Sequence, residues 1–188
     1  KNLADLRQKW ADAGKAIKQA QAEHKPVFVD VWAVWCVPCA QLEKTTYKVP
    51  GIIDASRRFV PLKIDNDVQT LFVQAHRITA WPTLLFLDAR GHELGRVEGY
   101  VDAATLEPIM RRVADGFGNY EAAIGPNASL EQLTRASEYL ASCGNPEEGA
   151  ALLQKAVKAA KERELHDSID LQLGRYHAAH GNKKAAAK

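Results

Sequence analysis

The sequence has few cysteines, little net charge and no long apolar run, and each shortage excludes a class of protein. Three cysteines in 188 residues are too few for a fold held together by disulfides. A formal net charge of +2 gives no reason to expect a nucleic acid or an anionic membrane surface as partner. The longest apolar run, Val31 to Pro38, is too short to cross a bilayer. The composition, 46% hydrophobic and 26% charged, is that of a globular protein with room for one domain and an appendage.

The most informative stretch is an apolar run that begins at Val27 and ends in two cysteines, Cys36 and Cys39. Its β-branched and aromatic residues predict a strand buried on both faces. After Cys39 the pattern takes the period of a helix, so Cys36 should lie where the strand meets a helix N-terminus. There the N–H groups and the helix dipole favour an anion, so we expect the pKa of the Cys36 thiol to be lowered. Pro38 suits the first helical turn.

Helices and strands alternate through the first two thirds of the chain. A strand, a helix and a second strand in succession predict a parallel pair joined by a right-handed crossover, and the last strand should return antiparallel after a turn. The predicted helices span 2–23, 52–58, 67–76 and 102–115, besides the one after Cys39, and the predicted strands after the first span 59–65, 84–88 and 93–99.

The remaining third is predicted to be helical. We expect a domain over 1–116, a linker over 117–128 and a helical extension over 129–188, with helices near 129–142, 146–164 and 166–180. Leu173–Gly174 followed by Gly181–Asn182 and Ala186 resembles a tetratricopeptide repeat, although the units number fewer than the ~3 that a free-standing array needs. An ordinary helical hairpin without a binding role is the alternative.

Metal binding is the other chemistry that a pair of nearby cysteines suggests. Structural zinc sites usually need a second such pair or added histidines, and the histidines of this chain show no convergent spacing. His177 and His180 share a helix face but are expected to be solvated. Cys143 precedes a glycine at a helix end and is expected to be a partly buried thiol, with a regulatory or linking role as the alternative. No metal or other cofactor is therefore expected beyond the Cys36–Cys39 pair.

Two separate motifs resemble thioredoxin. The segment from Val29 to Cys39 resembles its active-site segment, and Trp81–Pro82–Thr83 resembles its cis-proline loop. The likeness spans residues 26–115 and implies an α/β thioredoxin fold, a mixed central sheet flanked by helices, with an all-α C-terminal extension. The chain also resembles the periplasmic C-terminal domain of the bacterial thiol:disulfide interchange reductases. The features shared with that domain are Lys25–Pro26–Val27, Cys36–Val37 with Glu43–Lys44, and Gly99–Tyr100–Val101–Asp102–Ala103.

The resemblance implies a role for each cysteine. Cys36 would be the attacking thiolate, exposed at the helix start, and Cys39, one turn further on and more buried, would resolve the mixed disulfide. One helical turn suits the pair, because two bonded sulfurs need Cα atoms about 5–6 Å apart.

Two acids are candidates for proton transfer. Asp30 lies within an apolar strand, where burial should raise its pKa and let it accept a proton from Cys39; a structural Asp bonded to backbone is the alternative. Glu43, four residues after Cys39, lies on the same helix face and could be a second acid, or a solvated side chain. The lysine that usually neighbours the buried acid would fall at Pro61, which leaves Lys63 on the same strand face.

The substrate groove is implied by the same likeness. Pro82 should follow a cis peptide bond, so that the backbone of Trp81 lies beside Cys36 and pairs with an extended substrate segment. Trp35 should line the groove, with Val37 and Pro38 between the cysteines. Trp32 is expected to belong mainly to the core.

The predicted function is thiol–disulfide oxidoreduction on protein substrates, supplied with electrons by an upstream thiol donor. The alternative is a thioredoxin-like adaptor or co-chaperone whose helical extension binds a partner protein. The likeness to an extracytoplasmic domain implies a periplasmic or exported protein, with the cytoplasm as alternative. Lys1 to Asp5 do not form a signal peptide, but such a signal is absent from a mature exported protein.

Overall fold

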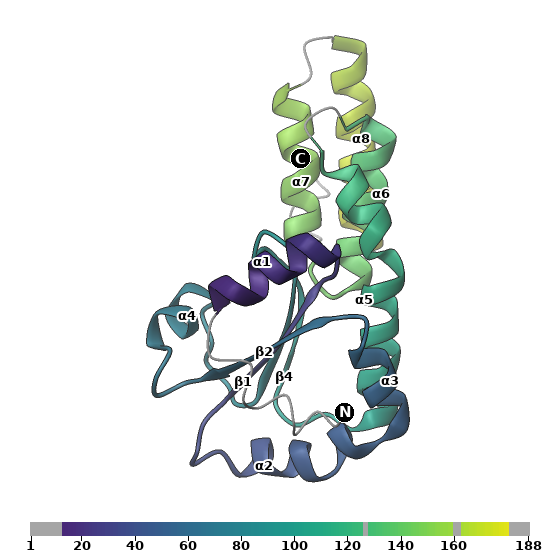
Figure 1. The fold of residues 1–188 in the computed structure, drawn as a ribbon. Helices are drawn as coiled ribbons and strands as arrows, with labels where there is room; N and C mark the ends of the chain where they lie inside the picture. The colour runs from purple at the N-terminus through teal and green to yellow at the C-terminus, as the bar shows by residue number, and fades with distance from the viewer. Residues whose placement is uncertain (1–12, 126–127, 160–162, 181–188) are drawn as a thin grey trace. The chain divides into compact units, whose positions relative to one another are not determined.

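The computed structural model describes residues 13–125, 128–159 and 163–180. These residues belong to two compact units, with the division after Phe117. The first unit holds the sheet and the second is made of helices (Figure 1).

The first unit is built on a four-stranded mixed sheet in the order β2-β1-β3-β4. The central strand β1 pairs in parallel with β2 and antiparallel with β3, and β4 extends β3 antiparallel. This is the thioredoxin fold expected from the sequence. The strands are β1 (Val27–Trp32), β2 (Val60–Asp65), β3 (Thr83–Leu87) and β4 (Glu93–Glu98).

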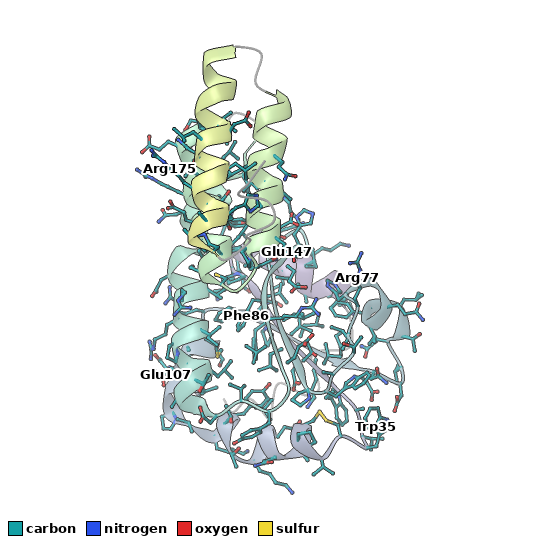
Figure 2. The ribbon with its side chains drawn as sticks, turned by 180° about the vertical axis from the view of Figure 1, so that it is seen from behind. Trp35, Arg77, Phe86, Glu107, Glu147 and Arg175 are labelled. Atoms are coloured by element: carbon teal, nitrogen blue, oxygen red, sulfur yellow. A yellow bond between two sulfur atoms is a disulfide. The ribbon has the colours of Figure 1, made fainter. Side chains whose placement is uncertain are left out.

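The burial of the strands follows from their sequence patterns. Five consecutive residues of β1 are buried, as a strand covered on both faces requires, whereas β2 alternates buried and half-buried positions. The rings of Phe28, Phe59 and Phe86 pack against one another with centroids 5.4 to 6.0 Å apart, edge to face between Phe28 and Phe59 and tilted in the other two pairs. Figure 2 shows Phe86 among the packed side chains of this unit.

Helices flank this sheet. In Figure 1, α3 and α5 lie side by side, and an ion pair of 3.8 Å between Asp54 of α3 and Arg111 of α5 joins them. On the opposite flank, α1 is tied to the end of β3 because Gln21 donates to the Ala89 carbonyl at 3.0 Å. The helices that begin in the first unit are α1 (Ala13–Glu23), α2 (Val37–Lys44), the 3-10 turn η2 (Thr46–Lys48), α3 (Pro50–Ser56), α4 (Thr70–Ala75) and α5 (Ala103–Ala123). The division after Phe117 falls within α5.

Several helix boundaries differ from the predicted ones. Residues 2–12 of the first predicted helix lie outside the described residues. The helix after Cys39 ends at Lys44 and gives way to η2 at two successive β-branched residues, Thr45 and Thr46, which are poor helix formers. Helix α4 begins at Thr70 rather than at Asp67, because Asp65 accepts hydrogen bonds from the backbone of Asp67 and Gln69 and holds these residues in a turn.

Helix α5 is longer than the sequence predicted. It continues to Ala123, so residues 117–123 of the expected linker are helical. Phe117, Tyr120 and Ala123 are all buried and recur every third residue, which is the spacing of a packed helix face. Gly116 and Gly118 suggested a break, but the tertiary burial of this face outweighs their low helix propensity.

The second unit contains three further helices, α6 (Leu130–Ser142), α7 (Pro146–Ala159) and α8 (Arg163–Ala179). A capping box begins α6, with the Ser129 side chain accepting from the backbone of Gln132 and the Gln132 side chain accepting from the backbone of Ser129. Tyr176 packs with Ala150 and Leu153 in the core of this unit.

His177 corrects one expectation. It is buried, with 5% of its surface exposed, whereas the sequence suggested a solvated side chain. Its ring lies edge-on to that of Tyr176, 6.1 Å away, so it belongs to the packed face of α8. His180, at the end of the same helix, is exposed as expected.

Candidate active site

Cys36 occupies the N-cap position of α2. Its backbone is extended, with φ −81° and ψ 98°, and its Sγ accepts a hydrogen bond from the backbone N–H of Cys39 at 3.2 Å. Val37 and Pro38 form the first turn, where Pro38 lacks only an N–H that would otherwise be unpaired. The helix therefore directs a backbone donor and its positive end at the Cys36 sulfur, as the sequence predicted.

Cys36 and Cys39 form a disulfide, with their Cα atoms 5.3 Å apart. One turn of α2 thus brings the two sulfurs into bonding range. The expectation that Cys36 is the exposed partner is wrong for this oxidised form, since Cys36 and Cys39 are 5% and 4% exposed. The partly buried rings of Trp32 and Trp81 pack against the two cysteines and shield them from solvent.

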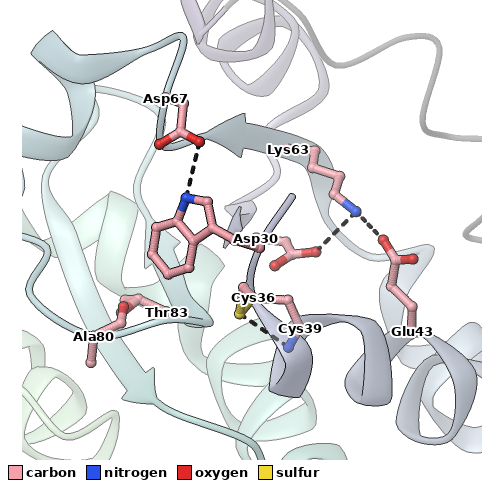
Figure 3. Close-up of a disulfide and its surroundings, with 9 residues drawn as sticks. Asp30, Cys36, Cys39, Glu43, Lys63, Asp67, Ala80 and Thr83 are labelled. Carbon is pink, nitrogen blue, oxygen red and sulfur yellow. Dashed lines mark hydrogen bonds and ion pairs between the residues drawn. A yellow bond between two sulfur atoms is a disulfide. The ribbon is translucent and has the colours of Figure 1, made fainter. Parts of the chain in front are cut away.

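A buried cluster of charges lies behind the disulfide (Figure 3). Asp30 of β1 pairs in register with Lys63 of β2, and the Lys63 Nζ lies 3.6 Å from Asp30 Oδ2 and in direct contact with the Glu43 carboxylate. The exposed fraction of the side chain is 4% for Asp30, 9% for Lys63 and 22% for Glu43. The three groups form a series from the buried acid to a partly solvated one, and the lysine between them offsets part of the cost of burying charge.

The cluster is completed by two aromatic side chains. The Lys63 Nζ lies 4.6 Å from the ring centroid of Trp32, within cation–π range. Burial, and next the Asp30 carboxylate, raise the pKa of the Tyr47 hydroxyl well above its ordinary value. Tyr47 therefore stays neutral at any physiological pH and faces Asp30 as a buried phenol.

The proline loop lies on the other side of the disulfide. The Trp81–Pro82 peptide bond is cis, and the Pro82 carbonyl accepts from the backbone of Gly99 at 2.7 Å. Gly99 has φ +81°, a conformation that glycine adopts without steric cost. Thr83 donates to the Ala80 carbonyl at 2.7 Å. These bonds fix the loop against β4.

Trp35 joins the proline loop to the loop before α4. Its ring lies edge-on to that of Trp81, with centroids 5.4 Å apart, and its Nε1 donates to Asp67 Oδ2 at 3.0 Å. Of the predicted groove residues, Trp35 and Val37 are exposed, Pro38 and Trp81 are half-buried and Pro82 is buried. The structure thus brings all of the predicted site residues to one end of the sheet; their roles in substrate binding and catalysis remain predictions.

Sequence reasoning missed two residues of this site. Asp67 was assigned to a helix start rather than to Trp35, and only a turn signal in Asp65–Asn66–Asp67 pointed otherwise. Tyr47 was not among the predicted site residues, and nothing in the sequence marks its approach to Asp30. Among the described residues there is no cluster of three or more histidine, cysteine or acidic side chains placed to hold a metal ion.

The fold and the paired cysteines at a helix N-terminus define a class, the thiol–disulfide oxidoreductases of thioredoxin fold. The family model of the Thioredoxin-like domain matches residues 13–114, more than half of the chain, and the chain belongs to this family.

Relatives and solved structures agree with this assignment. The chain is 37% identical over 98 residues to the thiol:disulfide interchange protein DsbD of Klebsiella pneumoniae, an alignment that covers 49% of this chain and 16% of that protein. It is also 37% identical over 119 residues to DsbD of Pseudoalteromonas atlantica, covering 60% and 19%. The chain therefore spans less than a fifth of these relatives. A thioredoxin from Thermus thermophilus superposes with a TM-score of 0.53 at 25% identity, covering 58% of this chain and 88% of that one.

Proposed function

We propose that this protein reduces or exchanges disulfides in protein substrates, with Cys36 as nucleophile and Cys39 as resolving thiol. The observation that carries the proposal is the sulfur of Cys36 at the N-cap of α2, bonded to Cys39 and accepting its backbone N–H. In this position the helix stabilises negative charge on a Cys36 thiolate.

The reaction proceeds by two exchanges, each of which forms one S–S bond and breaks another. The Cys36 thiolate attacks a substrate disulfide and releases one substrate thiolate, leaving a mixed disulfide. The Cys39 thiolate then attacks Cys36 Sγ, releases the second substrate thiolate and forms the Cys36–Cys39 disulfide. The two electrons pass from this pair to the substrate, so an upstream dithiol must reduce the pair again before another turnover.

The buried charge cluster supports a role in proton transfer. Asp30, on β1 beneath the disulfide, is proposed to accept the proton that Cys39 loses when it attacks. Lys63 holds Asp30 and Glu43 together, and Glu43, the most exposed of the three, is proposed as the second acid through which that proton reaches solvent.

An insulin-reduction assay with a dithiol as electron donor tests the proposal. The wild-type protein should accelerate precipitation of the reduced insulin chains, and the Cys36→Ser variant should not. Absence of turnover in the wild type, or turnover that survives Cys36→Ser, would contradict it.

Location and electron donor are proposed on the strength of the relatives. Similarity to the interchange proteins supports a periplasmic or otherwise exported protein that receives electrons from an upstream thiol protein. None of the described helices combines the length and apolar character needed to cross a membrane. Cell fractionation followed by immunodetection of the protein tests this location.

An adaptor role for the helical extension is the second candidate. It is favoured by the separate compact unit after Phe117, in which α6, α7 and α8 pack on their own core. A tetratricopeptide-like arrangement and a protein partner on this unit are proposals. A chain ending at Ala123 should keep disulfide turnover and lose partner capture if the two functions are separate; unchanged capture would assign the partner to the first unit.

A further inference from the structure

The side chain of Trp81 carries a buried hydrogen-bond donor that no described residue accepts from in this oxidised structure. Its Nε1 is shielded from solvent, although the indole ring as a whole is partly exposed. Buried polar groups of proteins nearly always have a hydrogen-bond partner, because a buried donor without one loses the bonds that water would make with it. An unpaired donor in an active site therefore indicates an acceptor that another state of the protein supplies.

The packing of the indole ring limits where that acceptor lies. The Trp81 ring packs against the buried cluster of Ala33, Cys36 and Cys39, and it lies edge-on to the Trp35 ring, with centroids 5.4 Å apart. Because the ring is partly exposed and its Nε1 is not, the N–H edge is on the covered side, among these neighbours. Trp35 offers only the face of its ring, which is a weak acceptor, whereas the two cysteines offer sulfur.

The two cysteine sulfurs change as acceptors when the pair is reduced. In the disulfide both sulfurs are neutral and accept weakly. A dithiol that reduces the pair supplies two electrons, the S–S bond breaks, and the dithiol becomes a disulfide and loses two protons, of which Cys39 takes one and solvent the other. The sulfur of Cys36 is left as the thiolate, since the N-terminal end of α2 stabilises negative charge there.

We propose that the Trp81 indole N–H donates a hydrogen bond to the Cys36 thiolate of the reduced protein. The donor is unpaired in the oxidised form and paired in the reduced form, so it stabilises the reduced form and the attacking thiolate. A hydrogen bond to a charged group is stronger than one between neutral groups, and a buried site strengthens it further. This inference rests on the proposed function and adds Trp81 as a catalytic residue of the same site.

Nuclear magnetic resonance of the full chain tests this hydrogen bond directly. The chain has four tryptophans, each of which gives one indole N–H signal in a 15N-labelled sample, and the signal missing from Trp81→Phe belongs to Trp81. In the reduced protein this signal should move downfield from its position in the oxidised protein as Cys36 ionises. A signal that is the same in both redox states, or that does not titrate with Cys36, would overturn the inference.

Trp81→Phe tests the same bond by removing the donor while keeping an aromatic ring. The pKa of Cys36 in the reduced protein is measured from the pH dependence of its alkylation by iodoacetamide, followed on the Cys36 peptide by mass spectrometry. The substitution should lower the acid dissociation constant of Cys36 about tenfold, which raises its pKa by about 1. At a pH where Cys36 is ionised in both proteins, the redox equilibrium with glutathione should shift about tenfold toward the disulfide, or ~30 mV.

Trp35→Phe is the matched control, because the Trp35 indole N–H already donates to Asp67 in the oxidised protein. It should leave the pKa of Cys36 and the glutathione equilibrium as they are in the wild type. An equal pKa of Cys36 in the wild type and in Trp81→Phe would overturn the inference and leave the proposed function intact. A wild-type pKa no lower than that of a free cysteine would instead contradict the proposed function. Circular dichroism confirms that the variants fold.

Discussion

Two cysteines of this chain have the same burial and opposite surroundings. Cys36 and Cys143 are each 5% exposed, but Cys36 is the N-cap of α2 and Cys143 is the C-cap of α6. The N-terminal end of a helix presents unpaired N–H groups and partial positive charge, and the C-terminal end presents carbonyls and partial negative charge. A thiolate is therefore favoured at the first position and disfavoured at the second.

The side-chain neighbours add to this difference. Cys36 is bonded to Cys39, with the Asp30–Lys63–Glu43 cluster behind. The Cys143 sulfur lies 4.0 Å from the hydroxyl oxygen of Ser142, which is a neutral group. Exposure alone would rank the two cysteines equally. The helix end at which a cysteine lies and a partner thiol within bonding range therefore decide which of the two cysteines is reactive.

Replacing Cys36 and Cys143 by serine, one at a time, should give the largest difference in turnover between two variants. Cys36→Ser removes the nucleophile and should lower insulin reduction by at least about 10³-fold, to the uncatalysed rate. Cys143→Ser, the matched substitution in the other unit, should change turnover by less than about twofold. Comparable losses of turnover in the two variants would contradict the difference in reactivity between Cys36 and Cys143.

Neutralising the buried acid should have the next largest effect. Asp30→Asn keeps the shape of the side chain but removes the proposed acceptor for the Cys39 proton, so turnover should fall by about 10- to 100-fold. The insulin-reduction assay measures this loss. Glu148→Gln, on an exposed position of α7, is the control for loss of a negative charge. Turnover equal to that of the wild type would show that Asp30 is structural.

A substitution in the helical unit should affect stability without affecting chemistry. A Cβ at Gly149 would clash with the Tyr176 hydroxyl and lie 2.7 Å from the Ser137 carbonyl oxygen. Gly149→Ala should therefore destabilise this unit by about 2 kcal/mol, measured by urea denaturation followed by circular dichroism. Gly174→Ala, where no neighbouring atom lies within 4 Å, is the control. Equal stability of the two variants would contradict the packing described.

Tyr176→Phe should have the smallest effect. The Tyr176 hydroxyl donates to the Ser137 carbonyl at 2.9 Å, and its loss should cost about 1 kcal/mol. Burial, and next Glu138, raise the pKa of Tyr176 to about 12. The folded state then holds the proton more tightly than the unfolded chain, whose tyrosine pKa is about 10, so stability should fall as the pH rises from about 10 to 12. Denaturation midpoints across this range should decline less in the variant.

The sequence predicted the strands and the active-site segment of the thioredoxin unit more accurately than the ends of its helices. The apolar run of β1 and the cysteine pair placed Cys36 at a helix start because both patterns are local. The approach of Lys63 to Asp30 followed in part from strand alternation. The contacts of Tyr47 and Asp67 depend on where a helix stops and a turn begins, and tertiary packing decides those points. The same holds for the continuation of α5 past two glycines and for the burial of His177.

Trapping the mixed disulfide with substrate is the most direct test that Cys36 is the nucleophile. Reduced Cys39→Ser protein retains Cys36 and Cys143 as its two thiols and cannot resolve a mixed disulfide. After incubation with insulin, peptide mass mapping should find the adduct on Cys36 and unmodified Cys143. An adduct on Cys143, or equal amounts of adduct on the two residues, would contradict the assignment of Cys36 as the nucleophile.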